Sequence, residues 1–217
     1  MLQQWLTLLK TSRIIAVIRA GDWQEGKKKA QAVAQAGVKL IEVTWNSDQP
    51  LKLIEYLRTE FPSCRVGVGT ILDKQSLREA IQGGVQFAFS PHFSPELLEI
   101  AHSHNIPLTP GALSPTEILT AFQYGARTVK VFPISALGGV EYLKSILAPL
   151  PHLPLIPTGG VTLANAADYI KAGAIAVGLA GDLFPSFLVK QGNWQEISQR
   201  ARRLQQQLFN YIPPPIG

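Results

Sequence analysis

The 217-residue chain has a single cysteine, Cys64, which excludes an intrachain disulfide and a thiolate metal cluster. Its four histidines show none of the spacings that are typical of a zinc site, so no metal is expected. No apolar run reaches the roughly 18 residues of a membrane-spanning helix. The apolar part of the amphipathic segment Met1–Lys10 is too short for a secretory signal. These absences predict a soluble, cytoplasmic protein that acts without a metal and without a membrane.

Charged residues are also scarce: they make up 16% of the chain, against 46% hydrophobic residues, a balance typical of compact globular proteins. The net charge is +5, but the lysines and arginines are scattered, and their densest groups, Lys27–Lys29 and Arg200–Arg203, fall on segments with helical spacing. We interpret these groups as solvated helix faces, so no nucleic acid partner is expected. The mild positive charge suits an anionic small-molecule substrate. No change in composition divides residues 1–217, which predicts one domain.

Apolar runs rich in β-branched residues alternate along the chain with segments of helical spacing. Ser94 and Ser114 each precede a proline, a pattern typical of a helix start, and glycines follow several of the predicted helices. The predicted strands are Ile14–Arg19, Val38–Thr44, Arg65–Gly69, Phe87–Ser90, Pro107–Thr109, Thr128–Phe132, Leu155–Thr158 and Ala174–Gly178. The predicted helices between them are Trp23–Ala36, Pro50–Phe61, Lys74–Gln82, Pro95–Ser103, Pro115–Tyr124, Gly139–Leu147 and Leu163–Lys171.

This alternation predicts an α/β fold, a single (β/α)8 TIM barrel. An extra N-terminal helix over Met1–Lys10 would close the bottom of the barrel, and a C-terminal helix over Trp194–Asn210 would lie outside it before Pro213–Pro215 stops the chain. An open doubly wound sheet is the alternative. It is disfavoured because no GxGxxG motif follows the first predicted strand.

Lys130 stands in the middle of the apolar run Thr128–Pro133, which predicts a buried parallel strand with one ammonium group inside it. Burying an unpaired ammonium group is costly, so its pKa falls and part of it becomes the free amine. A free amine can attack a carbonyl and form a Schiff base. The alternative is a lysine at a strand end that extends to solvent or pairs with a carboxylate.

Glu42 is a second charged residue in an apolar strand. Strand alternation places Glu42 on one face with Thr44, and Lys130 on one face with Phe132, so both charges can point into the same cavity. The two residues form either a structural ion pair or a Schiff-base lysine with its acid/base. Hydroxyl and glycine residues at the neighbouring strand ends, where barrels hold their active sites, favour the second interpretation. A carboxyl group in a partly apolar site has a raised pKa, which suits proton transfer near neutrality.

Gly159 and Gly160 lie between the seventh strand and a helix that is predicted to follow directly, where bare N–H groups would form an anion site. Gly178 and Gly181 end the eighth strand, where barrels often complete a phosphate site. Ala136–Gly139 adds a loop of mostly small residues to the same rim. The alternative is that these glycines only make tight turns. Their placement after strands seven and eight favours a phosphate site.

The motifs that distinguish this chain are Ala16–Arg19, Gly37–Thr44, Val66–Thr70, Phe87–Pro91, Lys130–Pro133 and Pro157–Val161. Together they resemble the class I aldolases that cleave 2-keto-3-deoxy-6-phosphogluconate (KDPG) and 4-hydroxy-2-oxoglutarate (KHG). The resemblance covers nearly the whole chain. It implies a homotrimer of (β/α)8 barrels that cleaves KDPG to pyruvate and glyceraldehyde 3-phosphate, and/or KHG to pyruvate and glyoxylate. It also implies that no metal or other cofactor is required.

By this resemblance, Lys130 is the Schiff-base lysine and Glu42 the general acid/base. Thr70 hydrogen-bonds the pyruvyl carboxylate, and Phe132 packs beside the Schiff base. In the implied reaction, the Lys130 amine condenses with the ketone at carbon 2 and the iminium accepts electrons. Glu42 moves the proton of the carbon-4 hydroxyl as the bond to carbon 3 breaks. The other residues expected to contact the substrate are Asn46, Pro91, Thr158, Gly159, Gly160 and Gly181.

Two positions depart from the family pattern. Asn46 stands where the family has an arginine that grips the substrate carboxylate, and losing such a charge-assisted contact of roughly 1.5–3 kcal/mol weakens binding about ten- to a hundredfold. Gly181 stands where the family often has a phosphate-binding serine. Asp182 follows it, and its carboxylate would oppose phosphate binding unless it turns outward.

These departures leave other functions open. An oxaloacetate decarboxylase would use the same Lys130 iminium and needs no phosphate site. A barrel that only binds an anionic metabolite would not need a buried lysine and glutamate. A phosphosugar isomerase on the same scaffold would not need the amine. The Schiff-base chemistry is therefore more firmly indicated than the substrate.

Overall fold

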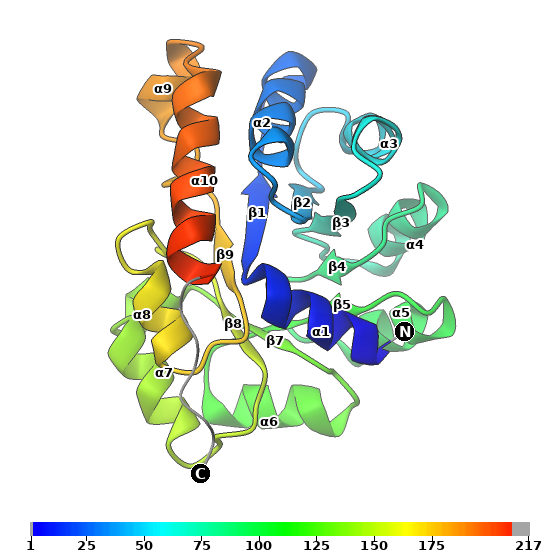
Figure 1. Ribbon diagram of the computed structural model, residues 1–217. Helices are drawn as coiled ribbons and strands as arrows, with labels where there is room; N and C mark the ends of the chain where they lie inside the picture. The colour runs from blue at the N-terminus through cyan, green and yellow to red at the C-terminus, as the bar shows by residue number, and fades with distance from the viewer. Residues whose placement is uncertain (1, 210–217) are drawn as a thin grey trace.

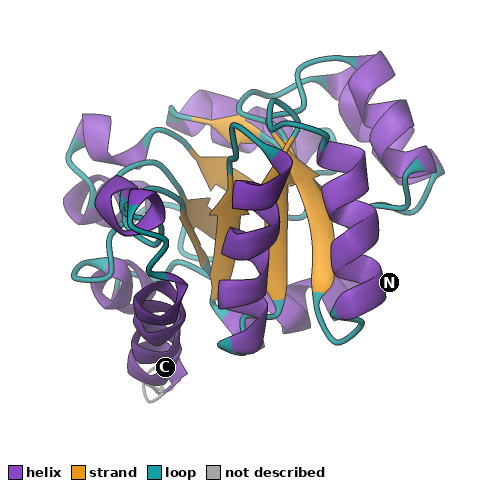
Figure 2. Cartoon of the chain, turned by 90° about the horizontal axis from the view of Figure 1, so that it is seen from above, coloured by secondary structure: helices purple, strands orange, loops and turns teal. Residues whose placement is uncertain are grey.

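The computed structural model describes residues 2–209 as short parallel strands surrounded by helices (Figure 1, Figure 2). Six strands form one curved sheet in the order β5-β4-β3-β2-β1-β9, and three form a second sheet in the order β6-β7-β8. An isolated parallel bridge between Thr158 and Gly178 links the end of β8 to β9. The strands are β1 (Ile14–Ile18), β2 (Leu40–Thr44), β3 (Arg65–Gly69), β4 (Ala88–Phe89), β5 (Leu108–Thr109), β6 (Gly111–Ala112), β7 (Val129–Val131), β8 (Leu155–Pro157) and β9 (Val177–Leu179).

Helices follow the strands in the predicted alternation, which confirms the α/β prediction. Ser94 begins one helix as an N-cap, and Ser114 begins another through a capping box with Glu117. The helices are α1 (Leu2–Ser12), α2 (Trp23–Gln35), α3 (Pro50–Glu60), α4 (Lys74–Gln82), α5 (Pro95–Ser103), α6 (Pro115–Gln123), α7 (Val140–Leu147), α8 (Ala166–Lys171), α9 (Ser186–Lys190) and α10 (Trp194–Phe209), with one 3₁₀ turn, η1 (Ile134–Leu137). The predicted helix ends at Met1 and Asn210, and Pro213–Pro215, lie outside the described residues.

The predicted fifth strand, Pro107–Thr109, is present as β5, and a second short strand, β6, follows it across Pro110, which has no N–H to donate to a ladder. Its carbonyl still accepts the backbone N–H of Lys130 at 2.9 Å. As a result β5 pairs with β4, β6 pairs with β7, and the two sheets meet at this proline. The chain therefore passes from one sheet to the other across this proline.

The interior of the curve is apolar and is covered at its amino end by α1. Trp5 of α1 stacks on Phe87, with ring centroids 5.1 Å apart, and its indole N–H donates to Thr128 Oγ1 at 3.4 Å. The buried residues of this inner cluster are Trp5, Leu9, Ile15, Val17, Leu40, Phe87, Phe89, Ile156 and Ala176. The predicted closing helix is thus confirmed over the described residues. No helix within residues 2–209 has the length and apolar character needed to cross a bilayer.

Two predicted boundaries near the last strands were wrong. α8 begins at Ala166 and not at Leu163, because Asn165 Oδ1 accepts the N–H of Thr162 while Thr162 Oγ1 accepts the N–H of Asn165, which holds a turn in place of a helix. The last strand, β9, begins at Val177 and not at Ala174. The short η1 and α9 were not predicted. The remaining predicted elements agree with the structure within about two residues at each end.

Candidate active site

The carboxyl ends of the parallel strands gather at one end of the sheets, which we call the mouth. It is formed by residues at or just after the strand ends: Arg19, Thr44, Thr70, Pro91, Phe132, Thr158 and Gly181. Two charged side chains come from inside the strands below it, Glu42 from β2 and Lys130 from β7. Strand alternation predicts that these two side chains converge on one cavity. In agreement, each of the two charges affects the pKa of the other residue.

Lys130 is only 6% exposed, and its strand is paired on both sides, with Gly111 of β6 and Ile156 of β8. Burial lowers the pKa of its ammonium group, although the negative charge of Glu42 opposes this change, and the positive charge of Arg19 lowers the pKa further. The direction predicted from the sequence is confirmed. Lys130 Nζ lies 4.5 Å from the centre of the Phe132 ring, so the aromatic face borders the amine.

Glu42 is 2% exposed, and burial raises the pKa of its carboxyl group, partly offset by the positive charges of Lys130 and Arg19. Its side chain crosses the neighbouring strand at Gly69, where an added Cβ would collide with the carboxyl group. Glycine at this position leaves the space that the carboxyl group occupies. The predicted rise in the pKa of Glu42 is also confirmed.

Lys130 and Glu42 influence each other without direct contact. Among the described residues neither side chain forms an ion pair or a hydrogen bond with the other. The only fully enclosed side-chain polar atom without a partner in residues 2–209 is Arg200 Nε, so the polar ends of Lys130 and Glu42 keep a small accessible surface. The arrangement is not that of a structural ion pair: the amine and the carboxyl group each lack a hydrogen-bond partner among the described residues.

Thr70 begins the loop after β3 in a left-handed conformation, with φ of 60°. This conformation costs a β-branched residue on the order of 1–3 kcal/mol and is concentrated at functional sites. Backbone bonds hold it from both sides, from Trp45 N–H to Gly69 O at 2.7 Å and from Ile71 N–H to Phe89 O at 3.2 Å. Thr70 is therefore fixed at the mouth, next to the strand that Glu42 crosses.

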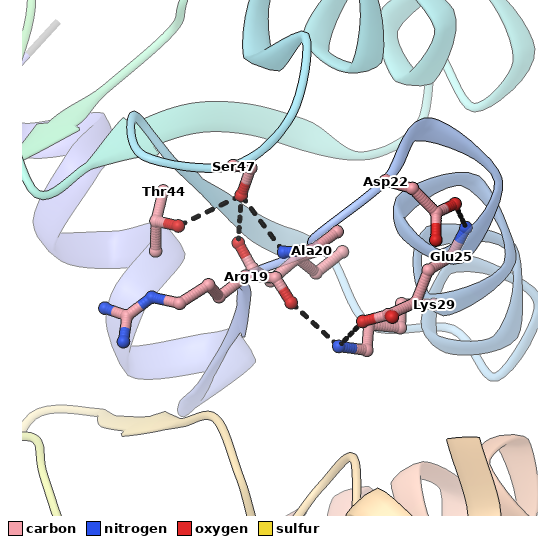
Figure 3. A network of polar contacts seen from close by, with 8 residues as sticks. Arg19, Ala20, Asp22, Glu25, Lys29, Thr44 and Ser47 are labelled. Atoms are coloured by element: carbon pink, nitrogen blue, oxygen red, sulfur yellow. Dashed lines mark hydrogen bonds and ion pairs between the residues drawn. The ribbon is translucent and has the colours of Figure 1, made fainter. Parts of the chain in front are cut away.

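Arg19, the residue after β1, is a component of the site that we did not predict. Its carbonyl accepts a 2.7 Å hydrogen bond from Lys29 Nζ, which also pairs with Glu25 (Figure 3). Ser47 Oγ accepts the next N–H, that of Ala20, at 3.2 Å. The backbone is thus held from two sides, while the guanidinium group extends beside Thr44 with no hydrogen bond or ion pair to the described residues (Figure 3).

The charge of Arg19 acts on both Lys130 and Glu42, which places it at the mouth. Asn46, where the resemblance implies an arginine, is exposed and its side chain has no hydrogen bond to the described residues. The positive charge near the site therefore comes from β1 and not from the loop after β2. A charged residue directly after the buried run Ile14–Ile18 was the signal in the sequence that could have identified Arg19.

The predicted phosphate loop follows β8. Gly159 and Gly160 have φ of 84° and 87°, and their N–H groups, with that of Val161, donate no hydrogen bond to the described residues. Successive free N–H groups of this kind form a concavity for an anion. An added Cβ on Gly159 would lie 3.0 Å from the Phe132 ring, so this concavity borders the ring that borders Lys130. Thr158, just before the loop, is buried and bridges to Gly178.

The carboxylate of Asp182 is already paired with other groups. It accepts the N–H of Leu163 at 2.7 Å and lies 3.5 Å from the guanidinium group of Arg200. The repulsion that the sequence predicted between the Asp182 carboxylate and a bound phosphate is therefore reduced, because the carboxylate is already paired. Gly181 is exposed, and an added Cβ there would meet no atom within 4 Å.

Pro91 ends the β4 side of the mouth. Its carbonyl approaches Gly111 so closely that a Cβ on this glycine would collide with it, and Gly111 is the residue that pairs with Lys130. Pro91 therefore lies against the strand next to the amine. Within residues 2–209 no three histidine, cysteine, aspartate or glutamate side chains come together in a way that could hold a metal ion.

A family model places the chain among known proteins. The model for KDPG and KHG aldolases matches residues 6–200. The chain belongs to this family. It is therefore an aldolase, a carbon–carbon lyase, as the sequence motifs indicated.

Individual family members are similar in sequence to this chain over most of their length. The chain is 33% identical over 196 residues to the 2-dehydro-3-deoxy-phosphogluconate aldolase of Pseudomonas aeruginosa, covering 90% of this chain and 89% of that protein. It is 32% identical to the KHG/KDPG aldolase of Escherichia coli K12, covering 93% and 96%. The solved structure of KDPG aldolase from Legionella pneumophila, with pyruvate captured as a covalent carbinolamine, has a TM-score of 0.84 and 28% identity, covering 92% and 97%.

Proposed function

We propose that this aldolase cleaves KDPG to pyruvate and glyceraldehyde 3-phosphate, and/or KHG to pyruvate and glyoxylate, through a Schiff base on Lys130. The observation that carries the proposal is the pair of buried groups at the mouth. The pKa of Lys130 is lowered, the pKa of Glu42 is raised, and the two side chains face the mouth without forming an ion pair. Enzymes that run amine and acid/base chemistry near neutral pH need such shifts.

The reaction follows from these two groups. The free amine of Lys130 attacks the ketone at carbon 2, and loss of water gives an iminium. The Glu42 carboxylate accepts the proton of the carbon-4 hydroxyl, the bond between carbons 3 and 4 breaks, and its electrons pass to the iminium to form an enamine. Protonation of the enamine at carbon 3 and hydrolysis release pyruvate and restore the amine. The iminium serves as the electron sink, so the reaction requires no metal or other cofactor.

The covalent carbinolamine captured in the Legionella pneumophila enzyme supports this route, since a carbinolamine is the adduct that precedes the iminium. The Phe132 ring beside Lys130 Nζ gives the adduct an apolar wall. We assign the substrate carboxylate to the Thr70 hydroxyl and the Arg19 guanidinium group. In this assignment Arg19 supplies the charge that Asn46 lacks, and Asn46 contributes a neutral amide at the rim.

The phosphate of KDPG is assigned to the concavity after β8. The free N–H groups of Gly159 and Gly160 support this assignment, and Thr158 and Gly181 border it. Pro91 closes the opposite side of the mouth. A carboxylate at Asp182 that is already paired with Arg200 leaves these donors available to the substrate.

We further propose that residues 1–217 form a single domain, a closed (β/α)8 barrel, which assembles as a homotrimer in the cytoplasm. Closure is supported by the chain continuity of β5 and β6 across Pro110 and by the bridge from Thr158 to Gly178. A designed cage built by fusing symmetric oligomeric domains matches this chain with a TM-score of 0.81 and 28% identity, which supports an oligomer. A buried free thiol at Cys64 suits a reducing compartment. Light scattering coupled to size exclusion would measure the number of subunits.

The test measures pyruvate release from KDPG, KHG and oxaloacetate side by side, with Lys130→Ala as the blank. Fast, lysine-dependent cleavage of KDPG or KHG is expected. Lysine-dependent decarboxylation of oxaloacetate without cleavage of either would overturn the aldolase proposal; the aldolase relatives do not favour that alternative. Borohydride reduction in the presence of pyruvate should trap an adduct on Lys130. Absence of an adduct would remove both functions that use the Lys130 amine, the aldolase and the decarboxylase.

A further inference from the structure

We propose that Ser135 supplies the side-chain hydroxyl that binds the substrate phosphate, in place of the serine that Gly181 lacks. This inference rests on the proposed function, because it concerns the phosphate end of the same substrate. Ser135 lies in η1, directly after β7, whereas Gly181 follows β9. The two residues come from strand ends on either side of β8, which the phosphate loop follows.

Two backbone hydrogen bonds fix the position of Ser135 against the phosphate loop. The N–H of Ile134 donates to Thr158 O at 3.0 Å, and the N–H of Ser135 donates to Gly159 O at 3.1 Å. Successive donors in η1 thus bind successive carbonyls of the loop after β8. These backbone hydrogen bonds hold Ser135 next to the loop. Because the serine side chain is short, its hydroxyl stays close to this fixed backbone.

The hydroxyl of Ser135 lies over Gly160. An added Cβ on Gly160 would collide with both the Cβ and the Oγ of Ser135, so the close approach requires glycine at this position. Ser135 is exposed, and its hydroxyl forms no hydrogen bond with the described residues. The N–H of Gly160 is free as well. A hydroxyl donor and an N–H donor thus lie together at one point of the rim, both unused.

The same point lies on a continuous path from the amine. Lys130 Nζ is 4.5 Å from the centre of the Phe132 ring, and this ring is 3.0 Å from the position of a Cβ on Gly159. Gly160 and then Ser135 follow. In this proposal, a substrate bound covalently to Lys130 extends across Phe132 and places its terminal phosphate near the two glycines and the Ser135 hydroxyl.

Gly181 cannot supply this hydrogen bond, since it has no side chain, and the next residue, Asp182, carries a carboxylate that is already paired with Arg200. The space around Gly181 is open: an added Cβ meets no atom within 4 Å. A serine at position 181 would therefore fit. The phosphate site can receive a hydroxyl from either side, and in this chain the hydroxyl comes from the β7 side.

The test compares KDPG with its unphosphorylated counterpart, 2-keto-3-deoxygluconate. In Ser135→Ala, the KM for KDPG should rise roughly ten- to a hundredfold with little change in kcat, which is the effect of losing one hydrogen bond to a charged group. The kcat/KM for the unphosphorylated substrate should stay within about twofold of the wild-type value. Ser145→Ala, an exposed serine whose hydroxyl bonds its own helix α7, is the matched control and should change neither value.

Two further variants distinguish a phosphate contact from a structural role. Gly181→Ser in the Ser135→Ala background should restore the KM for KDPG, because it returns a hydroxyl to the other side of the site. Ser135→Asp should weaken KDPG more than Ser135→Ala does, by repulsion. Equal losses on both substrates, or an unchanged KM for KDPG in Ser135→Ala, would overturn the proposal.

Calorimetric binding of 6-phosphogluconate, a stable phosphorylated acid, makes the inference independent of turnover. Wild-type protein that binds this probe more tightly than Ser135→Ala supports the phosphate contact even if KDPG is not cleaved, in which case the proposed function alone fails. Equal affinity of the two proteins, or no binding to the wild type, refutes the role of Ser135.

Discussion

Replacing Arg19 by methionine tests which residue provides the positive charge for the substrate carboxylate. The substitution keeps most of the side-chain length and leaves the backbone contacts of the Arg19 carbonyl with Lys29 in place. The guanidinium group has no partner in the described residues, so the free energy of unfolding should change by less than about 0.5 kcal/mol. The lost charge-assisted hydrogen bond, roughly 1.5–3 kcal/mol, should raise the KM for KDPG about ten- to a hundredfold.

The pH dependence gives a second measure of the same substitution. Arg19 lowers the pKa of Lys130 and also lowers the pKa of Glu42. Without its charge both values rise, and a higher pH is needed to produce the free amine and the carboxylate. The acidic limb of the plot of log(kcat/KM) against pH should therefore move to higher pH in Arg19→Met. Steady-state pyruvate release over a pH series measures both the KM and this limb.

The control restores the charge at the position where the family has it. Asn46→Arg in the Arg19→Met background should recover most of the affinity for KDPG, because an exposed residue on the neighbouring loop can extend over the same mouth. The reasoning would be refuted by an Arg19→Met enzyme with an unchanged KM and an unmoved acidic limb. A fall in kcat alone, with the KM unchanged, would assign Arg19 to the chemistry and not to carboxylate binding.

Other substitutions test the remaining parts of the site. Glu42→Gln should lower kcat by roughly 10²–10⁴-fold while borohydride still traps pyruvate on Lys130; loss of trapping would show that Glu42 is needed to form the adduct itself. Gly69→Ala should displace the Glu42 carboxyl group, lowering kcat and reducing the free energy of unfolding by about 1–3 kcal/mol in urea denaturation, and wild-type values would refute the crowding at this position. In the wild type the folded state loses the Lys130 proton before the unfolded chain does, so this group makes the free energy of unfolding rise with pH up to the ordinary value of 10.5. Lys130→Met should remove that contribution, and identical pH slopes for the two proteins would contradict the lowered pKa.

Strand alternation made the central part of the site predictable from the sequence. It placed Glu42 and Lys130 on inward faces because both residues lie within apolar strands of known period. Burial and the pKa directions followed from that placement. Outside the strands the predictions were less accurate. The polar turn at Thr162 and Asn165 uses side-chain hydrogen bonds that compete with helix formation, so α8 begins three residues later than predicted.

Arg19 and Ser135 were missed for two different physical reasons. Arg19 ends the predicted strand Ile14–Arg19 and continues the alternation of the inward residues Ile15 and Val17, but a charged residue at a strand end ordinarily extends to solvent, so the pattern alone did not mark it as a site residue. Its backbone is held by contacts with Lys29 and Ser47 from other parts of the chain. Ser135 belongs to a 3₁₀ turn whose register against Gly159 depends on backbone bonds between two loops. Such tertiary contacts leave no periodic signal in the sequence.

Both departures from the family pattern are matched by a residue from a nearby strand end. Arg19 follows β1, which pairs with β2, the strand before Asn46. Ser135 follows β7, which pairs with β8, and β8 is bridged to the strand before Gly181. Along curved sheets of parallel strands, a point above the mouth can be reached from more than one loop, so a binding group can come from a different strand. Lys130 and Glu42 have no such freedom, because their positions within the ladder fix the distance between amine and carboxyl group.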